Sequence, residues 1–474
     1  MADAPVLTRP LIGDFPAATE ADWRALVDKT LGEAPFTSLE KTTVEGLAIA
    51  PLYAPAPQPR APARAVPADR AWEVATLTAH PDPARANAEI LGDLRGGAAS
   101  AVMRIDPTGQ AGVAIGSTAD LMRALDGVIL EFAPVALDAG FLGPAAADWL
   151  GVVAKASPAA LVRFHLDPLS AYAQAGASPG PIEAHIASAA NVAARLAETY
   201  PTAPLFLASG RVVHEAGGGE AGEVAFAAAA AVAYARALVE AGLPMPQAFG
   251  AITLGLAADA DYFLTIAKLR AGRAVWARIA AASGADPVAR LEARSSRRML
   301  TAKDAWTNMI RLTAAGFGAA VGGADTVILG NFTDALGLPT EFGRRQSRNA
   351  QLVLMEEAHI GRVADPAAGA GYVEALTDQI ARAAWADFQA IEAIGGITAA
   401  LAAGHIANSV AAAKTARPEP RIIGVTAFPP AKDAPVEVEI AAAKPAAGAP
   451  SARLPGSDSA CAPLKPMRIS EAFE

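Results

Sequence analysis

The sequence predicts an α/β protein built on a (β/α)8 TIM barrel, with an extended N-terminal arm and a mostly unstructured C-terminal tail. Short, nearly all-apolar runs, typical of strands buried on both faces, alternate with amphipathic helical patterns. Eight such runs occupy roughly 250 residues, which is the size of a closed barrel. A doubly wound open sheet is the alternative that the same alternation leaves open.

The composition fits one large domain with extensions. The chain has 474 residues, of which 53% are hydrophobic and 18% are charged, so it can bury a large core. Its net charge of −9, without a basic stripe carrying interleaved aromatics, argues against a nucleic-acid-binding protein. Cys461 is the single cysteine, which excludes a disulfide framework and a cysteine-based metal site.

No targeting or membrane segment is predicted. Residues 1–20 lack a basic stretch followed by an apolar one, so they do not form a signal peptide. The apolar run at residues 224–239 is alanine-rich, and it is too short and too weakly apolar to cross a bilayer. With the single cysteine, these features favour a cytoplasmic protein.

Residues 1–53 form an arm rather than a domain. Thr19 is expected to cap a helix that Gly32 ends, and residues 34–53 have the pattern of a short strand and turn. An arm of this size has no core of its own and needs a surface to lie on. Residues 54–71 follow as a Pro/Ala linker of polyproline type.

The barrel domain is expected over residues 72–428. Eight buried strands are predicted at residues 98–105, 127–133, 160–166, 204–209, 249–256, 288–294, 325–331 and 362–365. Helices are predicted at residues 117–125, 145–154, 182–199, 223–241, 259–282, 304–321, 341–357, 372–394 and 399–414. Residues 429–474 form a low-complexity tail rich in Pro, Ala and acidic residues.

Four polar side chains follow the last two predicted strands. In a barrel the site is built at the carboxyl ends of the strands, which here would present Asn331, Asp334, Asp365 and Glu374. The alternative is structural, because a carboxylate in such a position commonly caps a helix. The glycine run at residues 217–219 is not a phosphate loop, since it lacks the sequence context of one.

Several long segments resemble the methylmalonyl-CoA mutase family. They are WTNMIRLT from Trp306, GGADTVILGNFTDALGLP from Gly322, RRQSRNAQLVLMEEAHIGRVADPAAGAGYVEALT from Arg344 and FQAIEAIGG from Phe388. Residues 43–53 are similar to the phrase that opens the family's chains. The resemblance implies a barrel whose arm reaches across to a partner subunit, and adenosylcobalamin radical chemistry that isomerises (R)-methylmalonyl-CoA to succinyl-CoA.

The chain departs from the family where catalysis is expected. The family's catalytic chains resemble SGYHIREAG where this chain has SGRVVHEAG, so Val212 replaces a histidine that donates a hydrogen bond to the substrate carbonyl, and Arg211 replaces a tyrosine. His214 lies two residues further on, and we interpret it as structural. The phrase at residues 294–297 is also altered, and the family's tyrosine-containing motif after the linker is absent.

The resemblance therefore implies a non-catalytic small (beta) subunit of a heterodimeric methylmalonyl-CoA mutase, in propionyl-CoA metabolism. Its partner would be the large (alpha) subunit, which would hold the adenosylcobalamin, because no DxHxxG motif follows residue 428. No catalytic or metal-binding residue is assigned, and neither a nucleic acid nor a membrane is expected as a partner. Glu215 and Asp334 match family positions near the cofactor, and we interpret them as remnants.

Three other functions remain open. A rewired isomerase is favoured if Arg211, His214 and Glu215 converge in one pocket. A non-enzymatic scaffold for loading another cobalamin protein would have a partner that is not a mutase. The barrel half of a split mutase would need the missing tyrosine and histidine motifs. The acyl-CoA used by the holoenzyme rests on family analogy alone.

Overall fold

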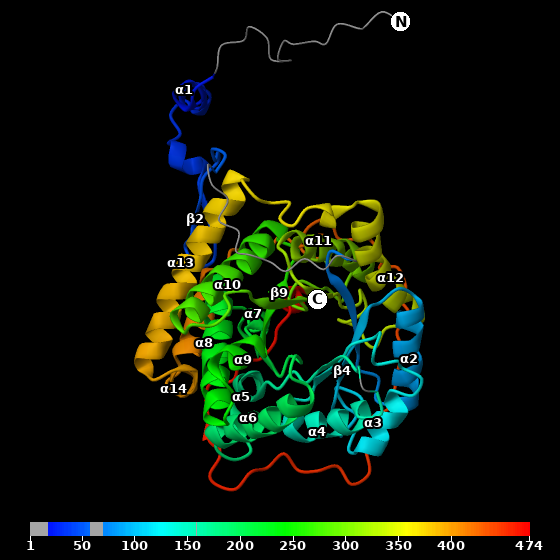
Figure 1. Ribbon diagram of the computed structural model, residues 1–474. Coiled ribbons are helices and arrows are strands. Elements are labelled where there is room, and N and C mark those ends of the chain that lie inside the picture. The colour runs from blue at the N-terminus through cyan, green and yellow to red at the C-terminus, as the bar shows by residue number, and fades with distance from the viewer. Residues whose placement is uncertain (1–17, 57–69, 158) are drawn as a thin grey trace, which may run out of the picture.

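The structure is a computed structural model that describes residues 18–56, 70–157 and 159–474. Its centre is an eight-stranded parallel sheet with the strand order β6-β5-β4-β3-β11-β10-β9-β8. A parallel bridge between Leu166 and Phe206 joins the two ends of this order, so the sheet closes into a barrel (Figure 1). The α/β barrel fold class is confirmed, and the open-sheet alternative is wrong.

The strands are short and buried, and helices surround them. The barrel strands are β3 (Glu73–Thr78), β4 (Ser100–Arg104), β5 (Val135–Asp138), β6 (Val162–Arg163), β8 (Phe206–Ser209), β9 (Ile252–Ala258), β10 (Arg290–Ser295) and β11 (Thr326–Ile328). The larger outer helices are α2 (Pro83–Arg95), α3 (Thr118–Ala124), α4 (Gly143–Ala154), α6 (Ile182–Thr199), α8 (Glu220–Glu240), α10 (Tyr262–Ala282), α11 (Asn308–Val321), α12 (Glu341–Leu352) and α13 (Gly371–Ile394). Shorter helices include α5 (Pro168–Ala175), α7 (Arg211–Glu215), α9 (Met245–Gly250), α14 (Ile397–Ala402) and α15 (His405–Ala416).

Two of the eight predicted strands are wrong, and two strands of the barrel, β5 and β3, were missed. Residues 127–133 form turns, and the strand begins instead at Val135. Residues 362–365 are not a strand, because the chain there packs as a loop over the start of the barrel, with Gly361 against Ala71. The eighth position in the barrel belongs to β3, which pairs with both β4 and β11.

Helix α8 is long and apolar enough to cross a membrane by length and composition. However, 83% of its most apolar window is buried inside the protein. Its buried side chains are mostly alanines, which let the helix lie close against the barrel wall. Burial of this extent accounts for the apolar sequence as that of a core helix.

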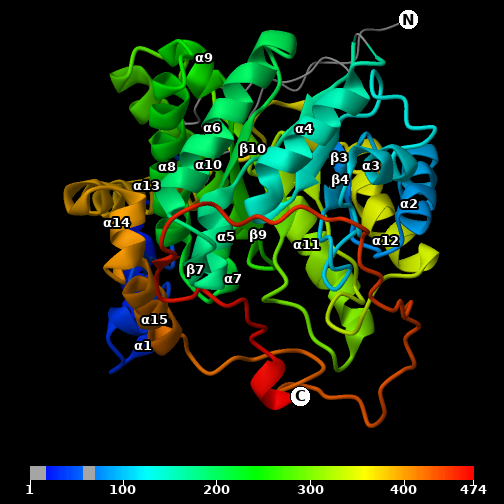
Figure 2. The same ribbon diagram turned by 90° about the horizontal axis from the view of Figure 1, so that it is seen from below.

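The tail follows the rim of the barrel although it contains little regular structure. Its backbone N–H groups donate to the carbonyl oxygens of Leu338, Pro107, Pro179, Gly176, Ala173, Glu215 and Arg298, from Glu439, Ala446, Leu454, Cys461, Leu464, Met467 and Ile469 respectively. All of these acceptors lie in segments that follow the carboxyl ends of barrel strands. The short strand β12 (Ser459–Ala460) also pairs with β7 (Ala177–Ser178). The tail is therefore a belt around that end of the barrel, and its red trace crosses Figure 2 past α5 and β7.

Side chains add to this attachment of the belt. Glu439 accepts two hydrogen bonds from Arg85, at 3.1 and 2.8 Å, and lies 3.3 Å from His80. Leu464 is buried in the main core, and Ser470 donates to the carbonyl of Leu300 at 3.1 Å. A segment with few helices and strands can thus be fixed by bonds to its neighbours.

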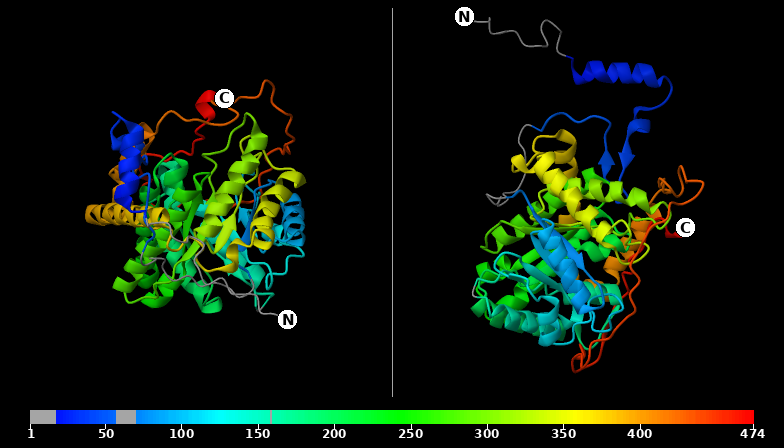
Figure 3. Two further views of the ribbon diagram at one scale, coloured as in Figure 1. Left: turned by 90° about the horizontal axis from the view of Figure 1, so that it is seen from above. Right: turned by 90° about the vertical axis from the view of Figure 1, so that its right-hand side faces the viewer.

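The N-terminal arm has an attached part and a projecting part. Helix α1 (Glu20–Leu31) has the predicted Thr19 cap and ends at Gly32, and none of its residues is buried. It stands away from the barrel (Figure 3). The hairpin of β1 (Lys41–Thr42) and β2 (Ala48–Ile49) lies closer to the barrel, near α13 (Figure 1).

Candidate functional site at the barrel lumen

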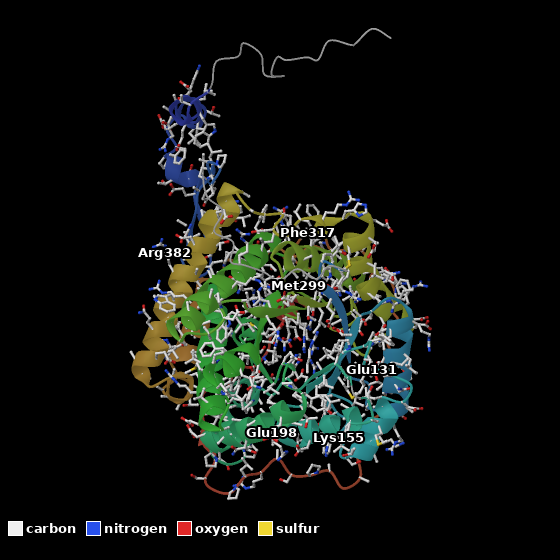
Figure 4. The ribbon with its side chains drawn as sticks, in the orientation of Figure 1. Glu131, Lys155, Glu198, Met299, Phe317 and Arg382 are labelled. Carbon is white, nitrogen blue, oxygen red and sulfur yellow. The ribbon has the colours of Figure 1, made fainter. Side chains whose placement is uncertain are left out.

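Side chains fill the centre of the barrel (Figure 4), and several charged ones among them are paired across it beside a small apolar cluster of Ala75, Val102, Ala136 and Ile328. Arg163 on β6 donates two hydrogen bonds to Glu73 on β3, at 2.7 and 2.6 Å. Three steps in the strand order separate β6 from β3, so this bidentate pair crosses the interior. A paired guanidinium and carboxylate of this geometry is among the strongest hydrogen-bonded contacts in proteins.

A second group of charges lies nearer the carboxyl ends of the strands. Arg294 on β10 donates to Asp138 on β5 at 3.2 Å and to Glu292, two residues earlier on its own strand, also at 3.2 Å. Strands β10 and β5 are four steps apart in the closed order of eight, so they face each other across the lumen. Arg104 on β4 also approaches Asp138, at 3.6 Å.

The electrostatic environment keeps these groups in fixed protonation states. Although burial opposes ionisation, Arg104 and Arg294 hold the pKa of Asp138 well below its usual range. Burial lowers the pKa of His165 to about 4, so this imidazole is neutral near pH 7. Burial and the neighbouring Arg294 lower the pKa of Arg211 to about 10. The lumen is thus an internally paired set of charges rather than a poised acid and base.

The short helix α7 separates the candidate residues of the altered catalytic phrase. Arg211 donates to Ser209 at 3.0 Å. Its guanidinium also interacts electrostatically with the lumen charges of Asp138 and Arg294. His214 is fully buried. It contacts Glu223 of α8, Asp259 directly after β9 and Ser296 directly after β10. The three residues Arg211, His214 and Glu215 therefore do not converge in one pocket, which removes the stated support for a rewired isomerase.

Both ring nitrogens of His214 are occupied. Its Nδ1 atom lies 3.2 Å from Glu223, and its Nε2 atom lies 3.1 Å from Asp259 and 3.0 Å from Ser296. Lys268 donates to Glu223 at 2.6 Å. Burial opposes ionisation of Glu223, but Lys268 and His214 outweigh it and lower its pKa to about 2. The histidine therefore lies in a closed network of charges and has no nitrogen left for a ligand, which supports its structural interpretation.

Glu215 and Asp334, the two predicted remnants, meet around one arginine. The carboxylate of Glu215 accepts from the backbone N–H of Arg297 at 3.1 Å, and the guanidinium of Arg297 donates to the carbonyl of Asp334 at 3.1 Å. The carboxylate of Asp334 accepts from the backbone N–H of Asn331 at 3.0 Å. Both carboxylates thus hold the loops that follow the strands.

The other two carboxylates predicted for the barrel mouth lie elsewhere. Asp365 and Glu374 both pair with Arg270 of α10, Glu374 at 2.5 Å. That contact lies in the layer of outer helices, because no strand precedes Asp365. The prediction that these two side chains are presented at strand ends is wrong, and they join α10 to α13 and the loop before it.

The lumen charges were missed by sequence reasoning, although one signal for them exists. Residues 290–295 read RLEARS, with Glu292 and Arg294 two positions apart in a strand otherwise suited to burial. Alternate residues of a strand share one face, so these two side chains must enter the same side of the sheet. Their partner on a strand opposite cannot be found from local sequence.

A shallow groove of about 310 Å³ lies on the outside of the barrel, between α6, α8 and the junction of α13 with α14. Arg236 and Glu392 form an ion pair of 2.7 Å in its wall. Its lining residues come from outer helices and their junctions, and none directly follows a barrel strand, where a barrel enzyme carries its site. Among the described residues, no group of three or more His, Cys, Asp and Glu side chains could hold a metal ion.

Comparison with known proteins identifies what this barrel is related to. Residues 55–450 match the family described as methylmalonyl-CoA mutase. The methylmalonyl-CoA mutase small subunit of Streptomyces virginiae is 40% identical over 94% of this chain and 76% of its own length. The small subunit of Propionibacterium freudenreichii subsp. shermanii is 36% identical over 89% of this chain and 70% of its own. The protein of Cereibacter sphaeroides named methylmalonyl-CoA mutase is 29% identical over 88% and 65%.

The similarity is therefore greater to the chains named small subunit than to the one named simply mutase. The predicted resemblance is confirmed over most of the chain, and the family match includes the barrel and the belt as far as residue 450. A small subunit implies a large one, and the family implies adenosylcobalamin in the assembled complex. The chain belongs to the methylmalonyl-CoA mutase family of isomerases, as a small subunit of the heterodimer.

Proposed function

We propose that this chain is a non-catalytic subunit that supports the isomerisation of (R)-methylmalonyl-CoA to succinyl-CoA by its large-subunit partner, as a step of cytoplasmic propionyl-CoA metabolism. The observation that carries the proposal is the filled lumen. A substrate entering it would have to separate pairs such as Arg294 with Asp138 and Arg163 with Glu73. Breaking one buried ion pair costs about 3–5 kcal/mol.

The residues at the strand ends do not fit adenosylcobalamin. A histidine that contacts the cofactor needs a free nitrogen, but both nitrogens of His214 are bonded and its side chain is fully buried. Val212 stands where the family resemblance expects a histidine, and it is an apolar side chain that cannot donate a hydrogen bond. We infer that the large subunit alone holds the cofactor in the complex.

The contribution of this chain would then be structural. Residues 18–53, the described part of the predicted arm, include a helix with no buried residue, and Leu26 on that helix is 65% exposed. Exposed apolar side chains on a helix without a core are typical of a segment that binds a partner. We propose that the arm binds the large subunit and that the barrel domain, 72–428, provides the rigid structure to which the arm is attached.

Purification of this chain alone, of the large mutase chain from the same organism alone, and of the two together tests the proposal. We expect a 1:1 complex by light scattering, turnover of methylmalonyl-CoA by the complex and none by this chain alone. A large chain that is fully active and stable without this one would contradict the supporting role. Turnover by this chain alone would contradict its non-catalytic nature.

A further inference from the structure

One attachment of the arm to the barrel is a carboxylate placed at the start of α8. The carboxylate of Glu45, in the turn between β1 and β2, accepts hydrogen bonds from the backbone N–H groups of Ala221 and Gly222, both at 2.9 Å. Gly219, the residue that precedes α8, has no side chain with which to cap the helix. Glu45 thus supplies a helix cap from a position more than 170 residues earlier in the chain.

The glycine run before α8 provides the space for this contact. A Cβ atom on Gly219 would lie 2.1 Å from the carboxyl carbon of Glu45, so a side chain there would displace the Glu45 carboxylate. The backbone of Gly219 has φ −91° and ψ 176°, a conformation that alanine adopts freely. The absence of a side chain at this position therefore serves the contact with Glu45 and not the backbone.

The carboxylates of α8 that lie near Glu45 are paired with cationic side chains of the barrel domain. Two carboxylates of the first turn of α8 have cationic neighbours, Glu223 with Lys268 at 2.6 Å and Glu220 with Arg298 at 3.7 Å. Burial and the nearby Glu220 raise the pKa of Glu45. A neutral amide at position 45 would keep only one of the two bonds, because Ala221 and Gly222 donate to different oxygens of the carboxylate.

A second attachment lies at the end of the arm. The ring of Tyr53 packs on Tyr372 of α13 with centroids 5.3 Å apart, and the N–H of Ala56 donates to the carbonyl of Gly369 at 3.1 Å. Two attachments on different helices fix a hairpin in direction, whereas one would leave it free to pivot. Helix α1 precedes this hairpin and projects from it (Figure 1).

We infer that Glu45 is a positioning residue for assembly: its contact with the start of α8 fixes the arm in the direction from which α1 reaches the large subunit. The inference rests on the proposed function, in which the arm grips that subunit. Glycine at position 219 is required only because Glu45 occupies the space beside it. The two positions should therefore behave as one unit when they are changed.

Four variants test this inference in the full-length chain: Glu45→Ala, Glu45→Gln, Gly219→Ala and the double variant Glu45→Ala with Gly219→Ala. Hydrogen exchange of residues 41–49 in the chain alone and the Kd for the large mutase chain are the two measurements. We expect Glu45→Ala and Gly219→Ala each to speed exchange in the hairpin and to raise the Kd about fivefold to tenfold, the effect of losing a helix cap. Glu45→Gln should have an intermediate effect, since its amide oxygen keeps one of the two acceptors whereas its NH2 group cannot accept the second N–H.

The double variant separates a specific contact from general damage. Since the clash at position 219 is with Glu45 itself, adding Gly219→Ala to Glu45→Ala should have no further effect, and additive effects would overturn the inference. Gly92→Ala on α2, where a Cβ meets nothing within 4 Å, is the control for substitution of a glycine.

Unchanged hairpin exchange in the Glu45→Ala variant, or an unchanged Kd despite faster exchange, would also overturn the inference. If the wild-type chain itself binds no large chain, the proposed function fails, and hairpin exchange alone then decides whether the contact holds the arm.

Discussion

The lumen of the barrel and the projecting helix of the arm use their bonding groups in opposite ways. In the lumen, charged side chains such as Arg294, Asp138 and Glu292 are paired with one another inside the chain. On α1, no residue is buried, and Leu26 is largely exposed. The region where a barrel enzyme binds its substrate is closed by its own side chains, and the capacity for new contacts lies on the arm. The difference supports the proposal that this chain acts by binding a protein and not by binding a substrate.

The largest expected effect comes from breaking the lumen network. Arg294→Met leaves Asp138 and Glu292 without this partner inside the barrel, and we expect a loss of about 3–5 kcal/mol in the free energy of unfolding. Chemical denaturation of the chain measures it. Arg195→Met is the control, because its pair with Asp148 is exposed, and we expect it to cost less than about 1 kcal/mol. Equal costs for the two variants would mean that the lumen pairs do not hold the barrel.

The next effect tests the other side of the comparison. Leu26→Glu places a charge on the exposed face of α1, and we expect the Kd for the large chain to rise about tenfold or more, as for the loss of one buried leucine. The midpoint of thermal unfolding of the chain alone should not change. Met122→Glu on α3, where the side chain is also exposed, is the matched control and should leave the Kd unchanged. A similar loss from both variants would contradict a specific role of the arm.

A smaller effect concerns the pH dependence of stability at the lumen end of α5. Burial raises the pKa of Asp167 to about 6, and Tyr234 donates to its carboxylate at 2.6 Å. The stabilisation from its bound proton is complete below the unfolded pKa of about 4 and is lost as pH rises through about 6. Asp167→Asn keeps an acceptor and does not titrate, so we expect the wild type to lose stability relative to this variant between pH 4 and 7. A constant difference in the free energy of unfolding over that range would contradict the raised pKa.

The smallest expected effect is none. Val212→His restores the residue type that the family resemblance expects at this position, but it leaves the pairs of Arg294 and Arg163 in the lumen. We expect no methylmalonyl-CoA turnover by this variant alone, measured with added adenosylcobalamin. Activity from this single change would show that the ion pairs do not close the lumen, and it would weaken the comparison with the arm.

Local patterns predicted most of the fold because they determine most of it. The cap of α1 at Thr19 and the helix over α13 depend on neighbouring residues, and both are confirmed. Strand β3 was missed because its sequence, EVATLT, mixes polar and apolar residues directly after a linker. Glu73 faces the charged lumen in its pair with Arg163, whereas Thr78 on the opposite face of the strand accepts from Arg344 of α12.

The candidate site was less predictable, because its contacts join distant parts of the chain. The absence of catalytic residues was inferred from the resemblance at residues 209–217, and it stays a prediction. The sequence distance between Arg294 and Asp138, or between Glu45 and Ala221, hides contacts that only barrel closure and the docked arm create. The belt was expected as a low-complexity tail, because backbone hydrogen bonds to a rim leave no periodic pattern in the sequence.

The stoichiometry of cobalamin in the purified complex tests the central claim most directly. The heterodimer should be saturated with adenosylcobalamin, freed of excess cofactor, and analysed for cobalt per mole of each chain, with this chain alone treated in the same way. The account predicts one cobalt per heterodimer and none retained by this chain alone. Two per heterodimer, or retention by this chain alone, would contradict a barrel whose own side chains occupy the place of a ligand.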